Sequence, residues 1–289
     1  MRSKNKGRIF TSKPDRFSAW PERIVCLTAE STEIVFALGA GDRIVGVSGY
    51  SVRPPEARRK EKVAAFTSVR MDKIRALQPD LLIGFSDLQK NIARDLVAEG
   101  FTVFISNQRS LKEISDTVIA IGRLIGCEEK AVKLARDFET EINRLAPRES
   151  SGVRPRIYFE EWDDPLISGI RWVSELIERL GGEDIFGEKS KGMTAKDRTV
   201  RPEDVLEADP DVIVASWCGK KVQKDKIRNR PGWERIKAVQ TDAIYEIKSS
   251  DILQPGLSLL DGARQLAAIF KAAGQPRRKQ LRIGERVNR

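Results

Sequence analysis

The chain has 289 residues, of which 40% are hydrophobic, and its formal net charge is +10. These values exclude a disordered chain and leave room for one large core or for two lobes. No apolar run approaches the roughly 18–20 residues that a membrane-spanning helix needs. The sequence contains no histidine, which excludes histidine zinc sites, Ser-His-Asp and Cys-His catalysis, and histidine ligation of haem or cobalt.

The N-terminal segment lacks the features of a secretory signal. Its basic start, MRSKNKGR, is followed by IFTSKPDRFSAWPER, without the apolar core of about 7–15 residues that a signal requires. The three cysteines show neither disulfide nor zinc spacing. We therefore predict a cytoplasmic protein from the sequence as written, and a periplasmic one if a signal segment precedes it. Residues 1–22 are expected to form an arm, and residues 273–289 a basic tail.

Strands and helices alternate along the chain. The residue pattern predicts buried strands in both halves, at 24–27, 44–47, 80–84, 101–105, 156–160 and 244–247. Between them it predicts helices, at 30–38, 88–99, 173–180 and 259–270. This alternation is typical of mainly parallel sheets covered by helices.

The stretch 111–147 carries apolar residues at helical spacing. Gly126 is expected to divide it, because glycine favours the end of a helix. The second helix, about 129–146, is followed by the polar segment RESSGVRPR, which is typical of a linker. We interpret this helix as a stiff spine between two lobes. The alternative is an ordinary helix inside a single domain.

Two stretches of the first half are echoed in the second. DKIRALQPDLLIG, from Asp72, matches EDVLEADPDVIVA, from Glu203, and TEIVFALGAGDRIVG resembles SELIERLGGEDIFG. Two matches in the same order favour two related lobes. We predict an N-terminal lobe at 23–127, a backbone helix and linker at 128–150, and a C-terminal lobe at 151–272. The fold class is therefore α/β, with two Rossmann-like lobes and a ligand cleft where the strand ends meet.

RIVCLTAESTEIVFALGAGDRIVGVSGYSVRPPEA, MDKIRALQPDLLIG and the long helix resemble the cobalamin- and iron-chelate-binding proteins of ABC importers. The resemblance covers about residues 23–270 and is more specific in the first lobe. It implies aromatic residues beside a flat ligand, at Tyr50, Phe66 and Phe85. It also implies that an acidic residue on each lobe, Asp72 and Glu203, docks on a membrane permease, although acidic side chains in a first helical turn are stabilised there without a partner.

Three segments of the second half follow predicted strands and are candidates for the cleft. EEWDDPLISG offers Glu161 and Trp162, and ASWCGKK offers Trp217 as a wall. KSSDILQPG offers Asp251, which the resemblance implies as a ligand contact, and Gln254. Cys218 is also a candidate. It is either an inert cysteine or, beside Lys220, a thiol of lowered pKa that acts as a nucleophile or soft metal ligand.

We therefore predict a binding protein without an intrinsic cofactor or resident metal, which takes a corrinoid such as cobalamin, or another metal chelate, as its ligand. It is expected to be a monomer, with an ABC-importer permease as a candidate partner. A cytoplasmic enzyme or metallochaperone that reuses the fold, with EEWDD and WCGK at its site, is the alternative. Nucleic-acid binding has the positive charge in its favour, but no recognised motif supports a specific nucleic-acid partner.

Overall fold

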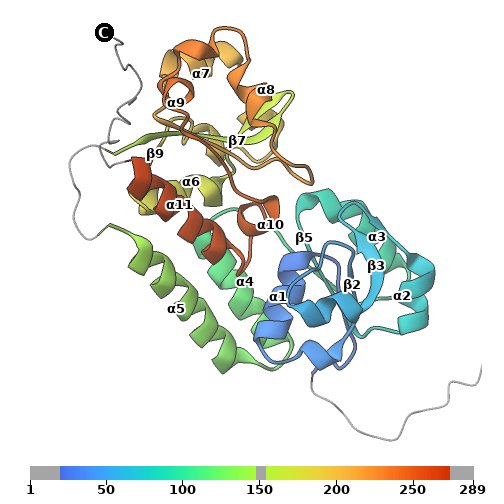
Figure 1. The fold of residues 1–289 in the computed structure, drawn as a ribbon. Coiled ribbons are helices and arrows are strands. Elements are labelled where there is room, and N and C mark those ends of the chain that lie inside the picture. Colours follow the sequence, from blue (N-terminus) through green and yellow to red (C-terminus); the bar gives the residue numbers. More distant parts are fainter. Residues whose placement is uncertain (1–19, 148–153, 274–289) are drawn as a thin grey trace, which may run out of the picture.

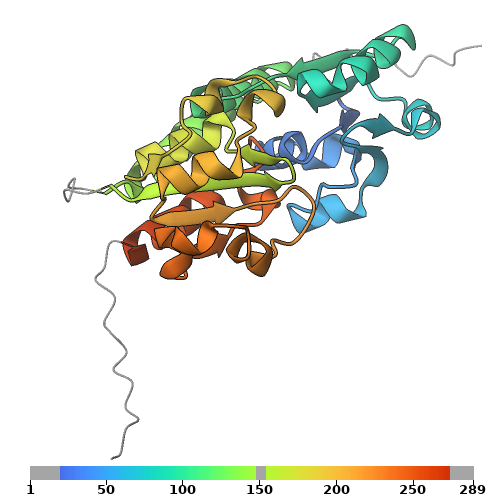
Figure 2. The same ribbon diagram turned by 90° about the horizontal axis from the view of Figure 1, so that it is seen from above.

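The chain folds into two α/β lobes that lie side by side and are joined by a layer of helices (Figures 1 and 2). The computed structural model describes residues 20–147 and 154–273. Most of the predicted arm, the end of the predicted linker and the tail beyond residue 273 lie outside these residues. None of the helices in the described ranges is long and apolar enough to cross a membrane.

The N-terminal lobe contains a six-stranded sheet in the order β4-β3-β2-β1-β5-β6. It is parallel except for the antiparallel pair β3–β4. Its strands are β1 (Ile24–Cys26), β2 (Ile44–Ser48), β3 (Glu61–Ala65), β4 (Ser68–Val69), β5 (Leu81–Phe85) and β6 (Val103–Ser106). The helices of this lobe are α1 (Ala29–Ala37), α2 (Met71–Leu77) and α3 (Lys90–Ala98).

Alternate residues of β1 pack on opposite faces of this sheet, because successive side chains of a strand point in opposite directions. Ile24 and Cys26 pack in the core beneath α1 and the long helices. Val25 and Leu27 pack in the core beneath α2 and α3. Both faces of the sheet are therefore covered, as the continuous apolar run of this strand requires.

The C-terminal lobe contains a five-stranded sheet in the order β11-β10-β7-β8, with β9 paired to β7. Its strands are β7 (Arg156–Asp163), β8 (Leu166–Ser168), β9 (Glu183–Asp184), β10 (Val212–Ala215) and β11 (Ile244–Glu246). Its helices are α6 (Arg171–Arg179), α7 (Pro202–Ala208), α8 (Lys224–Arg228), α9 (Lys237–Gln240), α10 (Ser249–Ile252) and α11 (Leu259–Ala273). Strand β7 runs through Asp163, so Glu161 and Trp162 lie within a strand and not in the loop after it.

The connecting layer consists of α4 (Leu111–Leu124) and α5 (Glu128–Leu145), separated at the predicted break near Gly126. Ser110 and Glu113 form a capping box that fixes the start of α4. One stripe of α5 contacts both lobes: Ala131 and Ala135 pack in the N-terminal core, and Phe138 packs in the C-terminal core. Since one helix is buried in two cores, bending between the lobes would disturb both.

Helix α4 shares this role, which the sequence did not indicate. Leu111 and Ile114 belong to the C-terminal core, whereas Val118 and Ile121 belong to the N-terminal core. The bilobal fold with a rigid helical connection is confirmed. The precise lobe boundaries proposed from the sequence stay a prediction.

The two halves repeat a specific set of backbone contacts. Asp80 accepts the backbone N–H of Arg23 at 2.9 Å, and Asp211 accepts that of Arg156 at 2.9 Å. The side chains of the same two arginines donate to carbonyl oxygens at the ends of α2 and α7. The sequence echo at the two Pro-Asp pairs therefore corresponds to a common way of fixing a helix end to the first strand of each sheet.

Candidate ligand-binding site

A cavity of about 300 Å³ lies between the lobes at the carboxyl ends of the strands. We call it the Tyr50 cavity. The N-terminal lobe contributes Thr28, Ala29, Glu30, Ser48, Tyr50, Phe66 and Phe85, and the C-terminal lobe contributes Cys218, Gly219, Ser249, Leu253, Gln254 and Pro255. This is the edge of an α/β sheet at which ligands usually bind.

A second cavity, also of about 300 Å³, adjoins it. We call it the Trp172 cavity, after a residue that lines it and was not predicted. Its walls include Arg109, Glu161, Trp172 and Arg198. The two cavities share Phe66, Phe85, Cys218 and Leu253. Together they form one interlobe region divided by these side chains.

The aromatic residues Phe66 and Phe85 are held in place by one buried amide. Gln89 accepts the backbone N–H of Phe85 at 3.1 Å and donates to the carbonyl oxygen of Phe66 at 2.9 Å. A side chain at Gly84 would place its Cβ 2.5 Å from the Gln89 Oε1 atom, so a larger residue there would displace this amide. This arrangement fixes two strand ends at the cavity. Nothing in the sequence alone indicated that Gln89 would make these two contacts.

Tyr50 is 59% exposed, unlike Phe66 and Phe85, and it reaches the cavity from the turn after β2. Phe85 is almost completely buried and makes an edge-on contact with Trp172 across the lobes, with ring centroids 6.5 Å apart. The indole of Trp172 donates to the carbonyl oxygen of Ile252 at 3.0 Å. The structure therefore brings Tyr50, Phe66 and Phe85 together, with an apolar contact at the seam.

Glu161 lines the Trp172 cavity but is not a free carboxylate. It forms a two-pronged ion pair with Arg198, at 2.5 and 3.0 Å, and the Arg198 side chain is only 4% exposed. Arg109 pairs with Asp87 at 2.6 Å and lies over the ring of Phe85. The cations of this cavity are thus matched by carboxylates.

Cys218 is exposed and lines both cavities. Although the residue is exposed in part, desolvation by its neighbours raises the pKa of the Cys218 thiol, and the charge of Glu161 adds to this effect. The interpretation of Cys218 as a thiol of lowered pKa is therefore wrong. Lys220, which motivated it, lies over the ring of Trp162 at 3.9 Å and forms an ion pair with Asp163.

Trp162 and Trp217 line neither cavity within the described residues, contrary to the sequence-based interpretation. Trp217 is 2% exposed, and its indole donates to buried Glu160 at 3.0 Å. Trp162 donates to the carbonyl oxygen of Asp164 at 2.8 Å, in the turn that follows β7. The Lys220 ammonium lies over both rings, 3.9 Å from the centroid of Trp162 and 5.0 Å from that of Trp217, so these tryptophans serve contacts within the C-terminal lobe.

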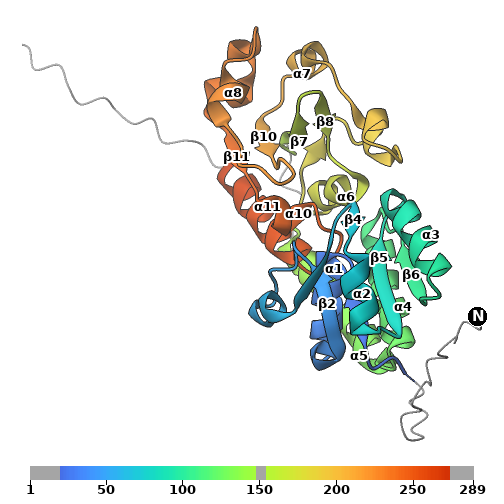
Figure 3. The same cartoon turned by 90° about the vertical axis from the view of Figure 1, so that its right-hand side faces the viewer.

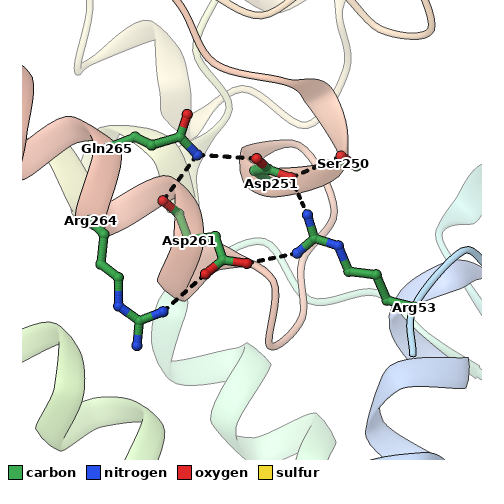
Figure 4. Close-up of polar contacts among 6 residues, drawn as sticks. All are labelled: Arg53, Ser250, Asp251, Asp261, Arg264 and Gln265. Atoms are coloured by element: carbon green, nitrogen blue, oxygen red, sulfur yellow. Dashed lines mark hydrogen bonds and ion pairs between the residues drawn. The ribbon is translucent and has the colours of Figure 1, made fainter. Parts of the chain in front are cut away.

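Asp251 also lies outside the walls of the two cavities and connects the lobes instead (Figure 4). Its carboxylate pairs with Arg53 of the N-terminal lobe and accepts from Gln265 at 3.1 Å. Arg53 also pairs with Asp261 of α11 at 2.8 Å. The neighbouring Gln254 does line the Tyr50 cavity. Figures 1 and 3 show α10 beside α1, which is where this contact closes the seam.

The two predicted docking residues are at the first turns of equivalent helices. Asp72 lies in α2, with its side chain 68% exposed and 3.4 Å from Arg70. Glu203 lies in α7 and is also exposed. Their matching positions follow from the repeat, one on each lobe.

The structure adds Glu30, which was missed because it precedes the more conspicuous Thr-Glu pair of α1. It is 5% exposed, and its Oε1 atom has no hydrogen-bond partner among the described residues. Burial raises the pKa of Glu30 to about 7, despite smaller opposing contributions from the Thr28 hydroxyl and the backbone N–H. Among the described residues, no group of three or more His, Cys, Asp or Glu side chains is placed to hold a metal ion.

A rigid bilobal α/β fold with a cavity at the seam is the architecture of a binding protein that encloses a ligand between lobes. The sequence profile described as periplasmic binding protein matches residues 24–250. The chain belongs to this family.

Individual relatives agree with this assignment. The vitamin B12-binding protein of Vibrio cholerae is 30% identical over 260 residues, which cover 87% of this chain and 90% of the relative. An ABC transporter substrate-binding lipoprotein of Bacillus subtilis is 25% identical over 257 residues, or 86% of this chain and 79% of the relative.

Two solved structures are similar as well. The periplasmic vitamin B12 binding protein of Vibrio cholerae has a TM-score of 0.70 at 29% identity and covers 89% of this chain and 99% of its own. The periplasmic heme-binding protein RhuT of Roseiflexus sp. RS-1 has a TM-score of 0.75 at 25% identity, covering 88% and 99%.

These comparisons contradict the cytoplasmic location predicted from the sequence. The family is that of periplasmic binding proteins, and the relatives named above are periplasmic proteins and a lipoprotein. The prediction rested on the composition of the first residues alone, whereas the family match rests on residues 24–250.

Proposed function

We propose that this protein is the substrate-binding component of an ABC importer and that it holds a corrinoid, or a related flat metal chelate, between its lobes. The observation that most supports this is the convergence of Tyr50, Phe66 and Phe85 on one interlobe cavity. Flat aromatic faces and a few polar groups are what a macrocycle with polar edges requires. The chelate is the cargo, and we assign the chain no intrinsic cofactor.

The two cavities adjoin. Each lies at the lower end of the volumes of ligand pockets, which are about 300–1,000 Å³, and is therefore small for a macrocycle. The walls that divide them are side chains from both lobes, and the seam is closed by Arg53. We therefore expect the ligand to occupy both cavities after a small separation of the lobes. Because α4 and α5 are packed in both cores, this movement is expected to be limited.

The ligand of the relatives supports this choice. The Vibrio cholerae relative is a vitamin B12-binding protein, and the Roseiflexus relative binds heme. The enzyme alternative gains no support, because Glu160, Glu161 and Asp163 of EEWDD are engaged in ion pairs and desolvation raises the pKa of Cys218. Binding without turnover is the function that we assign.

An ABC-importer permease is the partner that we propose, with Asp72 and Glu203 as the contacts on the two lobes. Both side chains are exposed and occupy equivalent helix starts, which supports a two-point contact. Charge reversal at both positions should abolish association with a cognate permease while leaving ligand binding intact.

The test of ligand binding is titration of the purified protein with cyanocobalamin and with hemin, followed by calorimetry and absorbance. Tyr50→Ala should weaken binding by roughly tenfold, the loss expected for one aromatic contact of about 1.4 kcal/mol. Val97→Ala is the matched control, because Val97 is similarly exposed at 60% but lies on α3 and lines neither cavity. Absence of binding by any corrinoid or chelate, or equal effects of the two variants, would refute the proposal.

A further inference from the structure

Glu30 is the acidic side chain in the wall of the Tyr50 cavity. It extends from the first turn of α1, is 5% exposed, and leaves Oε1 without a partner among the described residues. Buried carboxyl groups are normally paired or hydrogen-bonded, because leaving them unsatisfied is costly. A binding cavity is a place where such a group can be satisfied by a ligand.

The C-terminal lobe holds Glu30 in this environment. A Cβ built on Gly256 would lie 2.7 Å from the Cβ of Glu30, so the backbone of the 254–258 loop passes directly over this side chain. Gly256 allows that close approach, and a larger residue would push the lobes apart. Closure of the seam is thus what removes Glu30 from water.

The walls of the Tyr50 cavity provide no cation to balance this carboxyl group. Among the described residues that line it, none is lysine or arginine; besides Glu30, its polar side chains are hydroxyls, the Cys218 thiol and the amide of Gln254. The arginines that line the adjoining Trp172 cavity are already paired with Asp87 and Glu161. The site is therefore suited to neutral polar groups rather than to anions.

This distribution of charge discriminates between two kinds of chelate. An amide group can accept a hydrogen bond from a protonated carboxyl or donate one to an ionised carboxylate. A carboxylate group of a ligand would meet a like charge in a poorly hydrated space, where repulsion is strong. Corrinoids carry amide side chains around the ring, whereas hemin carries carboxylates.

We propose that Glu30 is a specificity-determining residue that selects corrinoids with amide side chains over chelates whose edge carries carboxylates. This inference rests on the proposed function and assigns the ligand class to that same site. It predicts that affinity depends on the groups at the rim of the macrocycle as well as on its flat face.

The titratable groups around Glu30 also disfavour a ligand carboxylate at this site. On its own helix Glu33 has a pKa raised to about 7 by burial, which Arg53 opposes in part, and Glu30 itself contributes to that rise. Cys26 on β1 is buried and stays a neutral thiol, since burial raises its pKa to about 12. The other titratable groups in the walls of the cavity are Tyr50 and Cys218. A ligand carboxylate would thus be opposed more strongly as the pH rises through about 7.

The experiment compares two ligands with the same ring. Cobinamide carries amide side chains, and cobyrinic acid carries carboxylates at the corresponding positions. Wild-type protein should bind cobinamide at least about tenfold more tightly, the change that corresponds to one pKa unit of interaction. The ratio should grow between about pH 6 and about pH 8, which bracket the pKa of Glu30.

Glu30→Gln removes the charge with almost no change of shape. It should reduce the ratio of the two affinities to about threefold or less and abolish its dependence on pH. Glu33→Gln is the matched control, because it makes the same change on the same helix at a partly buried residue that does not line the cavity. That variant should retain most of the discrimination of the wild type, because Glu33 does not line the cavity. The pH dependence of wild type alone tests the idea if a variant fails to fold.

The outcomes separate the two proposals. If neither corrinoid binds, the proposed function fails and this inference fails with it. If cobinamide binds but cobyrinic acid binds equally well at about pH 8, the binding function stands and the role of Glu30 is overturned. Equal loss of discrimination in Glu30→Gln and Glu33→Gln would also overturn it.

Discussion

The two lobes share a scaffold but treat polar and aromatic side chains differently at the cleft. The N-terminal lobe presents Tyr50, Phe66 and Phe85 and one unpaired acid, Glu30. The C-terminal lobe buries Trp217 and neutralises its carboxylates with cations, as Arg230 does for Glu160 and Arg198 does for Glu161.

The difference shows where a repeated fold is free to diverge. The contacts of Asp80 and Asp211 fix the amino-terminal edge of each sheet in the same way. At the carboxyl-terminal edge, loops of different length and composition follow the strands, and those loops carry function. One lobe therefore supplies surfaces for stacking, and the other supplies a rigid, internally paired wall.

The buried ion pair of the C-terminal lobe gives the largest expected effect. Glu160 is fully buried and Arg230 forms a two-pronged pair with it, at 2.5 and 3.0 Å. Arg230→Met would leave a buried carboxylate without its cation and should lower the free energy of unfolding by about 3–5 kcal/mol. Urea denaturation measures it. Arg75→Met, which breaks an exposed pair of the N-terminal lobe with Glu99, should have no measurable effect, and similar losses would remove the contrast between the lobes.

Replacement of Glu30 should have the opposite effect and raise the free energy of unfolding at high pH. The folded protein holds the Glu30 proton more tightly than the unfolded chain, since its pKa rises from 4.5 to about 7. This group therefore favours folding below about pH 4.5, and the contribution is lost as the pH rises through about 7. Glu30→Gln should be more stable than wild type at about pH 8, by about 2–3 kcal/mol, and the two should converge near pH 4.5.

The free energies of unfolding of Glu30→Gln and wild type, measured across this pH range, test the prediction. Glu188→Gln serves as a control, because its side chain is 89% exposed, and it should track wild type at each pH. A stability difference between Glu30→Gln and wild type that does not vary with pH would contradict the assignment of a buried, neutral carboxyl.

The ion pairs at the seam between the lobes should contribute less to the free energy of unfolding. Arg53, which is about one-third exposed, pairs with Asp251 and Asp261 of the other lobe (Figure 4). A double-mutant cycle with Arg53→Met and Asp251→Asn should give a coupling energy of about 1 kcal/mol. If the coupling energy were zero, the ion pairs would not hold the lobes together, and the packing of α4 and α5 would account for the closed arrangement.

The repeated contacts should give the smallest effects, and nearly equal ones. Asp80→Asn and Asp211→Asn each weaken a hydrogen bond to a backbone N–H at the start of a sheet. Each should lower the free energy of unfolding by about 0.5–1 kcal/mol. Thermal unfolding of the two variants compares their losses of stability. A severalfold larger loss in one of them would show that the repeated contacts do not contribute equally.

Much of this fold is determined locally and could therefore be read from the sequence. The alternating strands and helices, the long helix that ends near Pro147 and the Pro-Asp echo depend on periodicity, proline and glycine, which act over a few residues. The aromatics of the first lobe were anticipated from the family resemblance, which rests on these local motifs. The class of protein followed from the same motifs.

The chemistry of the second lobe depended on contacts that sequence spacing does not encode. Glu160 and Arg230 are far apart in the chain, as are Glu161 and Arg198, so a run of acids looked available although each of these two has its own partner. The burial of Trp217 against Glu160 and the position of Glu30 in the cavity wall were decided only by the tertiary arrangement. Local propensity is set by neighbours along the chain, whereas pairing and access to water are set by neighbours in space.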